Sequence, residues 1–270
     1  MIIHQTISIF LLSGAMATAQ WLNYPAPGTP RLPNGKPNLN APAPRGAGGH
    51  PDLSGVWQLE PAPCAANAIQ PCAGDYRGGR EFGNIGARLA SGLPYQPWAA
   101  ELVKKRTADL GKDDPVAWCK PAGALRLLTY PPYRKIIQMP GLTILLSERD
   151  VTYRQIFTDG RSLPEDPSPS WNGYSIGKWE GDVLVVQTNG LRDGTWLDRN
   201  GSPLTEAAKM TEKYRRVNFG NLEIEVTIDD PKAYTKPWTV VLHQMLVPDT
   251  ELLDYYCNDN EKDSVHAVGK

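Results

Sequence analysis

The part of the chain that follows residue 134 is a nearly unbroken series of strand-like segments, and this series limits the possible fold more than any other feature. The segments are short, rich in β-branched and aromatic residues, and separated by turns rather than by amphipathic helices. Short turns join antiparallel strands, because parallel strands need a long crossover connection. Together with one earlier segment, the strand-like stretches are 53–59, 134–139, 142–148, 151–158, 174–179, 183–188, 210–217, 222–228, 238–247 and 251–257.

Such a series without crossover helices predicts an all-β fold. We expect a mainly antiparallel meander that closes, or nearly closes, into a lipocalin-like barrel, and the alternative is a sandwich of two sheets. Pro140 and Gly141 suit the central positions of a type II turn between two of the strands. Helix-like patterns are confined to residues 81–92 and 97–110, which we expect to pack outside the sheet or to cap it.

Residues 222–229 show the clearest alternation, with one apolar face and one polar face. If Phe219 and Gly220 form a two-residue hairpin loop, Arg216 lies opposite Glu223, and the residue two before Arg216 lies opposite Glu225. The polar row then has two interpretations. It is either a charge ladder that faces solvent or the lining of a barrel interior.

The N-terminal sequence MIIHQTISIFLLSGAMATAQ is an apolar run that gives way to small residues, with an A-x-A cleavage pattern before Gln20. We expect residues 1–19 to be a signal peptide, and the alternative is an anchor that stays attached. Later segments lack the apolar length that a membrane span needs, so we expect a secreted or periplasmic protein. The near balance of 28 basic and 29 acidic residues argues against nucleic acid as a partner and favours a small molecule.

Residues 20–51 are rich in Pro, Gly, Asn and Ala, and they predict an extended, irregular arm. The arm contains a loose repeat, in which GKPNLNAPAPR is followed by GHPDLSGVW. Residues 52–270 are expected to form a single barrel-like domain. The oligomeric state does not follow from these features.

The four cysteines form an even set, which suits an exported protein with disulfides. Among the three possible pairings we favour Cys64 with Cys72, as a local clamp, and Cys119 with Cys257, which ties the end of the chain to its middle. The sequence has no CxxC and no His-rich cluster, so we expect no metal site. It also lacks a phosphate-binding loop, and we expect no cofactor.

Two resemblances add to this reading. Gly55 and Trp57 form a G-x-W at the first strand, which is similar to the signature of lipocalins and the wider calycin group, where the Trp closes one end of an up-and-down barrel. The motifs YRQIFTDGR, GYSIGKWEGDVLVV, TEKYRR and TIDDPKAYTKPWT, within residues 153–239, resemble a family of secreted bacterial proteins without an assigned function. In that family His is frequent at the positions of Tyr174, Leu204 and Lys209, so no role of those histidines carries over to this chain.

The segment from Asp159 to Gly173 is longer than a hairpin needs, and long ordered loops are often functional. Its prolines are expected to stiffen it as a binding rim or lid. In the alternative interpretation Asp159 and Gly160 form a hairpin turn, and Trp171 and Trp179 close the end of the sheet.

Acid–base residues are the second group of candidates. His243 alternates with apolar residues on one strand face, which predicts a partly buried core histidine, and a general base is the alternative. Paired carboxylates near aromatic residues are typical of glycoside cleavage, but linear spacing does not place two of them across a cleft. The sequence has no G-x-S-x-G or H-E-x-x-H motif.

These features lead to three hypotheses of function. In the first, a secreted β-barrel binds a small apolar or amphipathic ligand in its interior, with Tyr133, Trp171, Tyr174 and Trp179 as ligand-binding residues. In the second, a hydrolase, lyase or isomerase uses acid–base residues at the barrel mouth. The candidates for catalysis are His243, Asp159, Arg161 and Glu165. In the third, an envelope protein makes its contacts through the arm and the loops.

Overall fold

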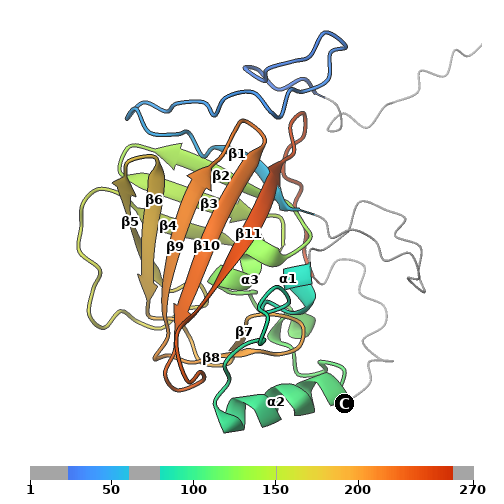
Figure 1. Ribbon diagram of the computed structural model, residues 1–270, viewed down its shortest axis with the longest axis vertical. Helices are drawn as coiled ribbons and strands as arrows, with labels where there is room; N and C mark the ends of the chain where they lie inside the picture. The colour runs from blue at the N-terminus through green and yellow to red at the C-terminus, as the bar shows by residue number, and fades with distance from the viewer. Residues whose placement is uncertain (1–23, 61–79, 150, 258–270) are drawn as a thin grey trace, which may run out of the picture.

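The computed structural model describes residues 24–60, 80–149 and 151–257, and its main feature is a closed barrel of nine strands (Figure 1). Around the barrel the strands follow the order β1-β11-β10-β9-β6-β5-β4-β3-β2, and β2 pairs with β1 to close the ring. The predicted barrel is therefore confirmed, and the sandwich is excluded. The strands are β1 (Gly55–Leu59), β2 (Arg134–Met139), β3 (Leu142–Ser147), β4 (Tyr153–Phe157), β5 (Tyr174–Glu180), β6 (Val183–Asn189), β9 (Lys209–Arg216), β10 (Asn221–Asp229) and β11 (Trp238–Leu246).

Short helices and a second small sheet accompany the barrel. The helices are α1 (Arg80–Gly83), α2 (Pro97–Ala108) and α3 (Ala124–Thr129), and the small sheet pairs β7 (Thr195–Trp196) with β8 (Pro203–Leu204). Figure 1 shows α2, β7 and β8 below the barrel. The first predicted helix is much shorter than expected. Helix α3 was not predicted because it is only six residues long and all six are buried, so it has no solvent-exposed face to give a clear amphipathic pattern.

Inward-facing side chains from the strands pack into one hydrophobic cluster inside the barrel. The apolar face of β10 contributes Leu222, Ile224, Val226 and Ile228, all buried, as the alternation predicts. Trp57 of β1 is also fully buried in the cluster, and its indole Nε1 donates to the Leu53 carbonyl at 3.0 Å.

The predicted register of the β9–β10 hairpin is wrong by one residue. Glu223 lies opposite Arg215, and Glu225 lies opposite Lys213, because three residues, 218–220, rather than two lie between the hydrogen-bonded Val217 and Asn221. The loop is longer because its backbone also pairs with the arm: the amides of Phe219 and Gly220 donate to arm carbonyls.

The polar row of β10 faces solvent, as the charge-ladder interpretation expects. Lys213 donates to Glu225 at 2.7 Å, Arg215 pairs with Glu223, and all four side chains are partly or largely exposed. Such surface pairs contribute little to stability. Their exposed position does leave the opposite faces of β9 and β10 pointing inward.

The C-terminal segment 251–257 is not a strand, although its composition predicts one. A β-bridge joins Tyr255 to Arg149, the backbone amide of Leu253 donates to the Glu148 carboxylate at 3.1 Å, and Lys135 pairs with Glu251. The predicted disulfide between Cys119 and Cys257 is confirmed and ties the end of the segment to the body. A segment held in this way needs no sheet partner. The proposed pair of Cys64 and Cys72 and the expected signal peptide lie outside the described residues.

The arm crosses one end of the barrel (Figure 1) and folds into two loops with the same hydrogen bonds. Each loop begins at an arginine that forms a β-bridge with a proline six residues later, Arg31 with Pro37 and Arg45 with Pro51. In each, the arginine Nη1 donates at 3.1 Å to the carbonyl of the glycine four residues later. The loose repeat in the sequence is therefore a structural repeat, P-R-x-x-x-G-x-P.

The two arginines of the repeat hold the arm on the barrel. Arg31 makes two hydrogen bonds to Asp249, at 2.6 and 3.0 Å, and Arg45 makes two to Asp182, at 2.5 and 2.8 Å. These bonds hold the pKa of both carboxyl groups below the usual range. The arm is thus docked along its described length and is not a free linker.

Candidate functional site

The barrel has one irregular junction, between β4 and β5. These strands run parallel, whereas the other neighbouring strands in the barrel are antiparallel. Their ladder has only two residue pairs, Ile156 with Ser175 and Phe157 with Ile176. The hairpin-turn interpretation of Asp159 and Gly160 is therefore wrong, because a parallel pair requires the chain to return to the opposite end of the barrel.

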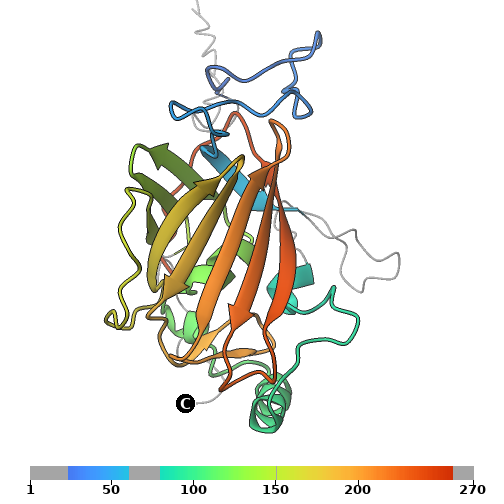
Figure 2. The same ribbon diagram turned by 60° about the vertical axis from the view of Figure 1, so that its left-hand side comes forward.

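Residues 158–173 make this return along the outside of the barrel, as Figure 2 shows. The segment is fixed to the body: the side-chain amide of Asn189 donates to the Pro164 carbonyl at 2.6 Å, and the Ser170 amide donates to the Gly190 carbonyl at 2.9 Å. Pro167 packs so closely over Gly190 that a Cβ on that glycine would lie 2.5 Å from the proline ring. The predicted proline-stiffened loop is thus an ordered crossover.

Side chains join β4 to β5 where the backbone ladder is missing. Arg154 points inward from β4 and donates to the hydroxyls of Ser175 and Thr188, at 3.0 and 2.9 Å. It also meets both carboxylate oxygens of Glu212, at 2.9 and 2.5 Å. On the outer side, the Asn172 amide donates to the Tyr153 carbonyl at 2.9 Å. We call this junction the β4/β5 seam.

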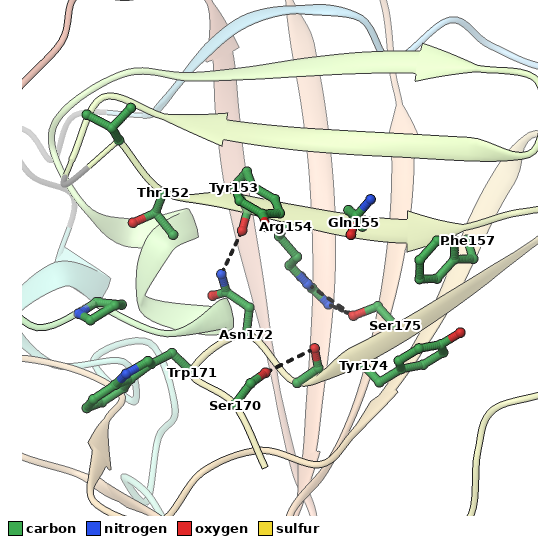
Figure 3. A pocket seen from close by; sticks show the side chains of 13 residues that line it. Thr152, Tyr153, Arg154, Gln155, Phe157, Ser170, Trp171, Asn172, Tyr174 and Ser175 are labelled. Carbon is green, nitrogen blue, oxygen red and sulfur yellow. Dashed lines mark hydrogen bonds between the residues drawn. The ribbon is translucent and has the colours of Figure 1, made fainter. Parts of the chain in front are cut away.

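A groove of about 470 Å³ lies over the outer side of the seam (Figure 3). This volume is within the range of small-molecule sites. The buried Arg154 and Ser175 form part of its floor, and the crossover forms one wall. The lining residues are Pro121, Val151, Thr152, Tyr153, Arg154, Gln155, Phe157, Ser170, Trp171, Asn172, Gly173, Tyr174 and Ser175.

Aromatic rings stand on both sides of the groove, and ring contacts hold Trp171, Phe157 and Tyr174 in place. The Trp171 ring is 5.0 Å from the guanidinium of Arg192, and the Trp171 carbonyl accepts from the first amide of α3 at 3.3 Å. Tyr174 stacks on Phe157 with ring centroids 5.3 Å apart. Tyr153 is 61% exposed. The groove therefore presents fixed aromatic surfaces with amide and hydroxyl groups between them.

The charged groups at the edge of the groove beside Tyr174 and Phe157 are paired with each other. Arg161 binds both carboxylate oxygens of Asp159 and donates to the Tyr174 hydroxyl at 3.1 Å. The Arg161 hydrogen bonds hold the pKa of Asp159 below its usual range, and those of Asp159 raise the pKa of Arg161. The Arg161 guanidinium also covers the Phe157 ring at 3.8 Å. This cluster orients Tyr174 but offers no unpaired acid or base.

The structure brings together only part of the predicted site. Trp171 and Tyr174 line the groove, and Asp159 and Arg161 stand at its edge, while Glu165 is exposed on the crossover.

The other predicted ligand-binding residues lie elsewhere. Trp179 stacks on His50 of the arm, with ring centroids 4.7 Å apart, and both line a cavity of about 430 Å³ under the arm. Tyr133 lines a separate cavity of about 680 Å³ beside Tyr130 and Tyr255. The four aromatic residues therefore do not share one site.

His243 is on the outer face of β11, and the prediction that it belongs to the core is wrong. Its side chain is 42% exposed and its Nδ1 lies 3.9 Å from Glu223, while the adjacent Leu242 and Gln244 face inward. Both faces of this strand carry apolar residues, so its alternation does not reveal which face is inside. Strands lie between β11 and β4 in either direction around the barrel, which separates His243 from Asp159.

Sequence reasoning missed several groove residues, namely Tyr153, Arg154, Gln155, Phe157 and Asn172. One signal was available: the second residue of the strand segment YRQIF is charged at a position that faces the core. A charged residue there implies a buried partner. The partner, Glu212, is 58 residues away, so no local pattern identifies it.

Comparisons with known proteins add no assignment: a scan against protein-family models gives no match, and a search of curated proteins gives none. No helix in the described part of the chain has the length and apolar character to cross a membrane. Within the same residues, no group of three or more His, Cys, Asp or Glu side chains is placed to hold a metal ion.

Proposed function

We propose that the protein is exported and binds a small amphipathic molecule in the groove over the β4/β5 seam. The observation that carries this proposal is the combination of fixed aromatic surfaces and uncharged polar groups around one open volume. Aromatic walls bury apolar ligand surface, and a few polar groups orient the ligand.

The groove replaces the barrel interior as the proposed binding place. The hydrophobic cluster and the pair of Arg154 and Glu212 occupy the interior. A ligand there would have to displace packed side chains, which is costly in an interior at crystal-like density. The outer groove requires no such displacement.

Binding is better supported than acid–base catalysis. None of the described residues that line the groove is an Asp, Glu or His. Asp159 is paired with Arg161, and His243 lies on a distant strand. The envelope-contact hypothesis assigns a role to the arm, but Arg31 and Arg45 of the arm are engaged by the barrel itself.

Export is part of the proposal. It rests on the N-terminal sequence, on the resemblance of residues 153–239 to secreted bacterial proteins, and on the disulfide between Cys119 and Cys257. Disulfides persist in oxidising compartments and are rare in the cytosol.

The test is mass spectrometry of small molecules retained by the full-length protein purified under native conditions. Trp171→Ala removes one wall of the groove, and Trp98→Ala removes an exposed tryptophan on α2 as the matched control. His243→Ala tests the enzyme alternative. We expect the wild type, Trp98→Ala and His243→Ala to retain the same compound and Trp171→Ala to lose it. Equal retention by Trp171→Ala would contradict the proposed site.

A further inference from the structure

The lining of the groove presents no unpaired charged side chain to a ligand, although an arginine forms part of its floor. The donors of Arg154 are directed to Glu212, Ser175 and Thr188, and its side chain is buried. The remaining polar lining is uncharged and consists of hydroxyl and amide side chains, among them Ser170, Gln155 and Asn172. An anionic ligand would lack an unpaired cation in this lining, and a cationic ligand would lack a carboxylate.

The polar groups lie between aromatic rings rather than at one end of an apolar tunnel. Figure 3 shows Arg154, Asn172 and Ser175 between Trp171 on one side and Phe157 and Tyr174 on the other. A long acyl chain would cover the exposed side-chain amide of Gln155 without offering it a hydrogen-bond partner, which is unfavourable. The arrangement fits a compact molecule that has apolar ring faces and polar groups around its edge.

One acceptor in the groove lacks a donor. The side-chain oxygen of Asn172 is buried and has no hydrogen-bond partner among the described residues. Leaving such an acceptor unsatisfied is unfavourable, so rotation of the Asn172 side chain toward the groove, where a ligand hydroxyl could donate to the oxygen, would be favourable.

From these features we infer that the ligand is a neutral saccharide, an inference that rests on the proposed function of the groove. A pyranose ring has C–H faces that stack on Trp171 and Tyr153, and its hydroxyls both donate and accept. Gln155 projects from the outer face of β4 between Tyr153 and Phe157, and its exposed amide can do the same. Rings held by Arg192 and Phe157 are already oriented, which lowers the entropy cost of binding.

Calorimetric titration of the full-length protein with neutral oligosaccharides tests this inference, with cellotetraose, xylotetraose, maltotetraose and chitotetraose as probes. We expect at least one to bind. Trp171→Ala should weaken its binding about tenfold or more, since an aromatic contact of this kind is worth about 1 kcal/mol beyond the area it buries.

Gln155→Ala should also weaken binding, while Trp98→Ala and Gln187→Ala should leave the Kd unchanged. Gln187 is a suitable control because it is exposed on the outer face of the neighbouring β6. Raising the ionic strength from about 0.05 M to about 0.5 M should not change the Kd, because no ligand charge is involved.

Two results would overturn the saccharide assignment. If Trp171→Ala and Gln155→Ala bind the oligosaccharide as the wild type does, the sugar binds elsewhere. If no oligosaccharide binds, while the retained compound depends on Trp171 and is charged or lacks a sugar, the ligand class is wrong and the proposed function stands. If no compound is retained either, the proposed function fails as well.

Discussion

Arg154 and Glu212 face each other inside the barrel and share two hydrogen bonds, although they are 58 residues apart in the sequence. Both side chains are shielded from solvent. The hydroxyl of Tyr214 also donates to Glu212, at 2.8 Å. Because the same arginine reaches across the seam to Ser175, this buried network supports the strands that form the groove floor.

Glu212→Gln is expected to destabilise the protein by about 3–5 kcal/mol, because it leaves Arg154 buried without a counter-charge. Chemical denaturation measures the effect. Glu225→Gln is the matched control, since it removes the partner of Lys213 in an exposed pair and should destabilise the protein much less than Glu212→Gln. Similar losses of unfolding free energy in the two variants would show that the buried pair contributes no more to stability than the exposed pair.

Tyr95 should make the protein less stable at high pH. Burial raises the pKa of Tyr95 to about 12, and its hydroxyl bonds to Ser202 at 2.8 Å. Between pH 10 and 12 the folded state therefore holds a proton that the unfolded state has released, so stability falls as the pH rises through this window. Tyr95→Phe should reduce the slope of unfolding free energy against pH there. An unchanged slope would contradict this account.

The disulfide between Cys119 and Cys257 closes a sequence separation of 138 residues. On the chain-entropy model such a closure stabilises by about 4–5 kcal/mol. Replacing both cysteines with Ser should therefore lower the unfolding free energy far more than replacing Cys64 and Cys72, whose predicted closure is short. Equal losses in the two double variants would contradict this dependence on loop length.

The two arm loops should respond independently to loss of their arginines. Arg31→Met is expected to speed hydrogen exchange at Gly35 and Asn38, and Arg45→Met at Gly49 and at the amide of residue 52, because each arginine closes only its own loop. Global stability should change little in both variants, since the pairs are at the surface. Faster exchange in both loops in either single variant would show that the arm opens as one unit.

The barrel could be predicted from the sequence because the alternation in its hairpins is local. Residues 222–228 reveal their inner face directly, and Pro140-Gly141 marks a turn. The register at β9–β10 could not be predicted, since the loop is extended by hydrogen bonds to the arm. The parallel junction could not be predicted for a related reason. Asp159-Gly160 is an ordinary hairpin signal, and only contacts with residues distant in the sequence hold the crossover in its path along the barrel.

The candidate site was predicted in part. Aromatic residues in the crossover pointed to Trp171 and Tyr174, which do line the groove, but the same criterion selected Trp179 and Tyr133, which do not. An aromatic residue in the sequence suggests burial or binding, but it does not show which aromatic residues come together at one site. The floor of the groove depends on the contact between β4 and β9, which exists only in the folded barrel.

The central claim is that a small molecule binds outside the barrel, over the β4/β5 seam. The most direct measurement is a ¹H–¹⁵N spectrum of labelled protein that has been refolded free of its retained molecules, recorded before and after addition of the small-molecule extract released from denatured wild-type protein. The indole signal of Trp171 and the side-chain amide signals of Gln155 and Asn172 should shift, while the indole of the buried Trp57 should not. A shift of Trp57 with Trp171 unchanged would place the ligand inside the barrel and contradict the account.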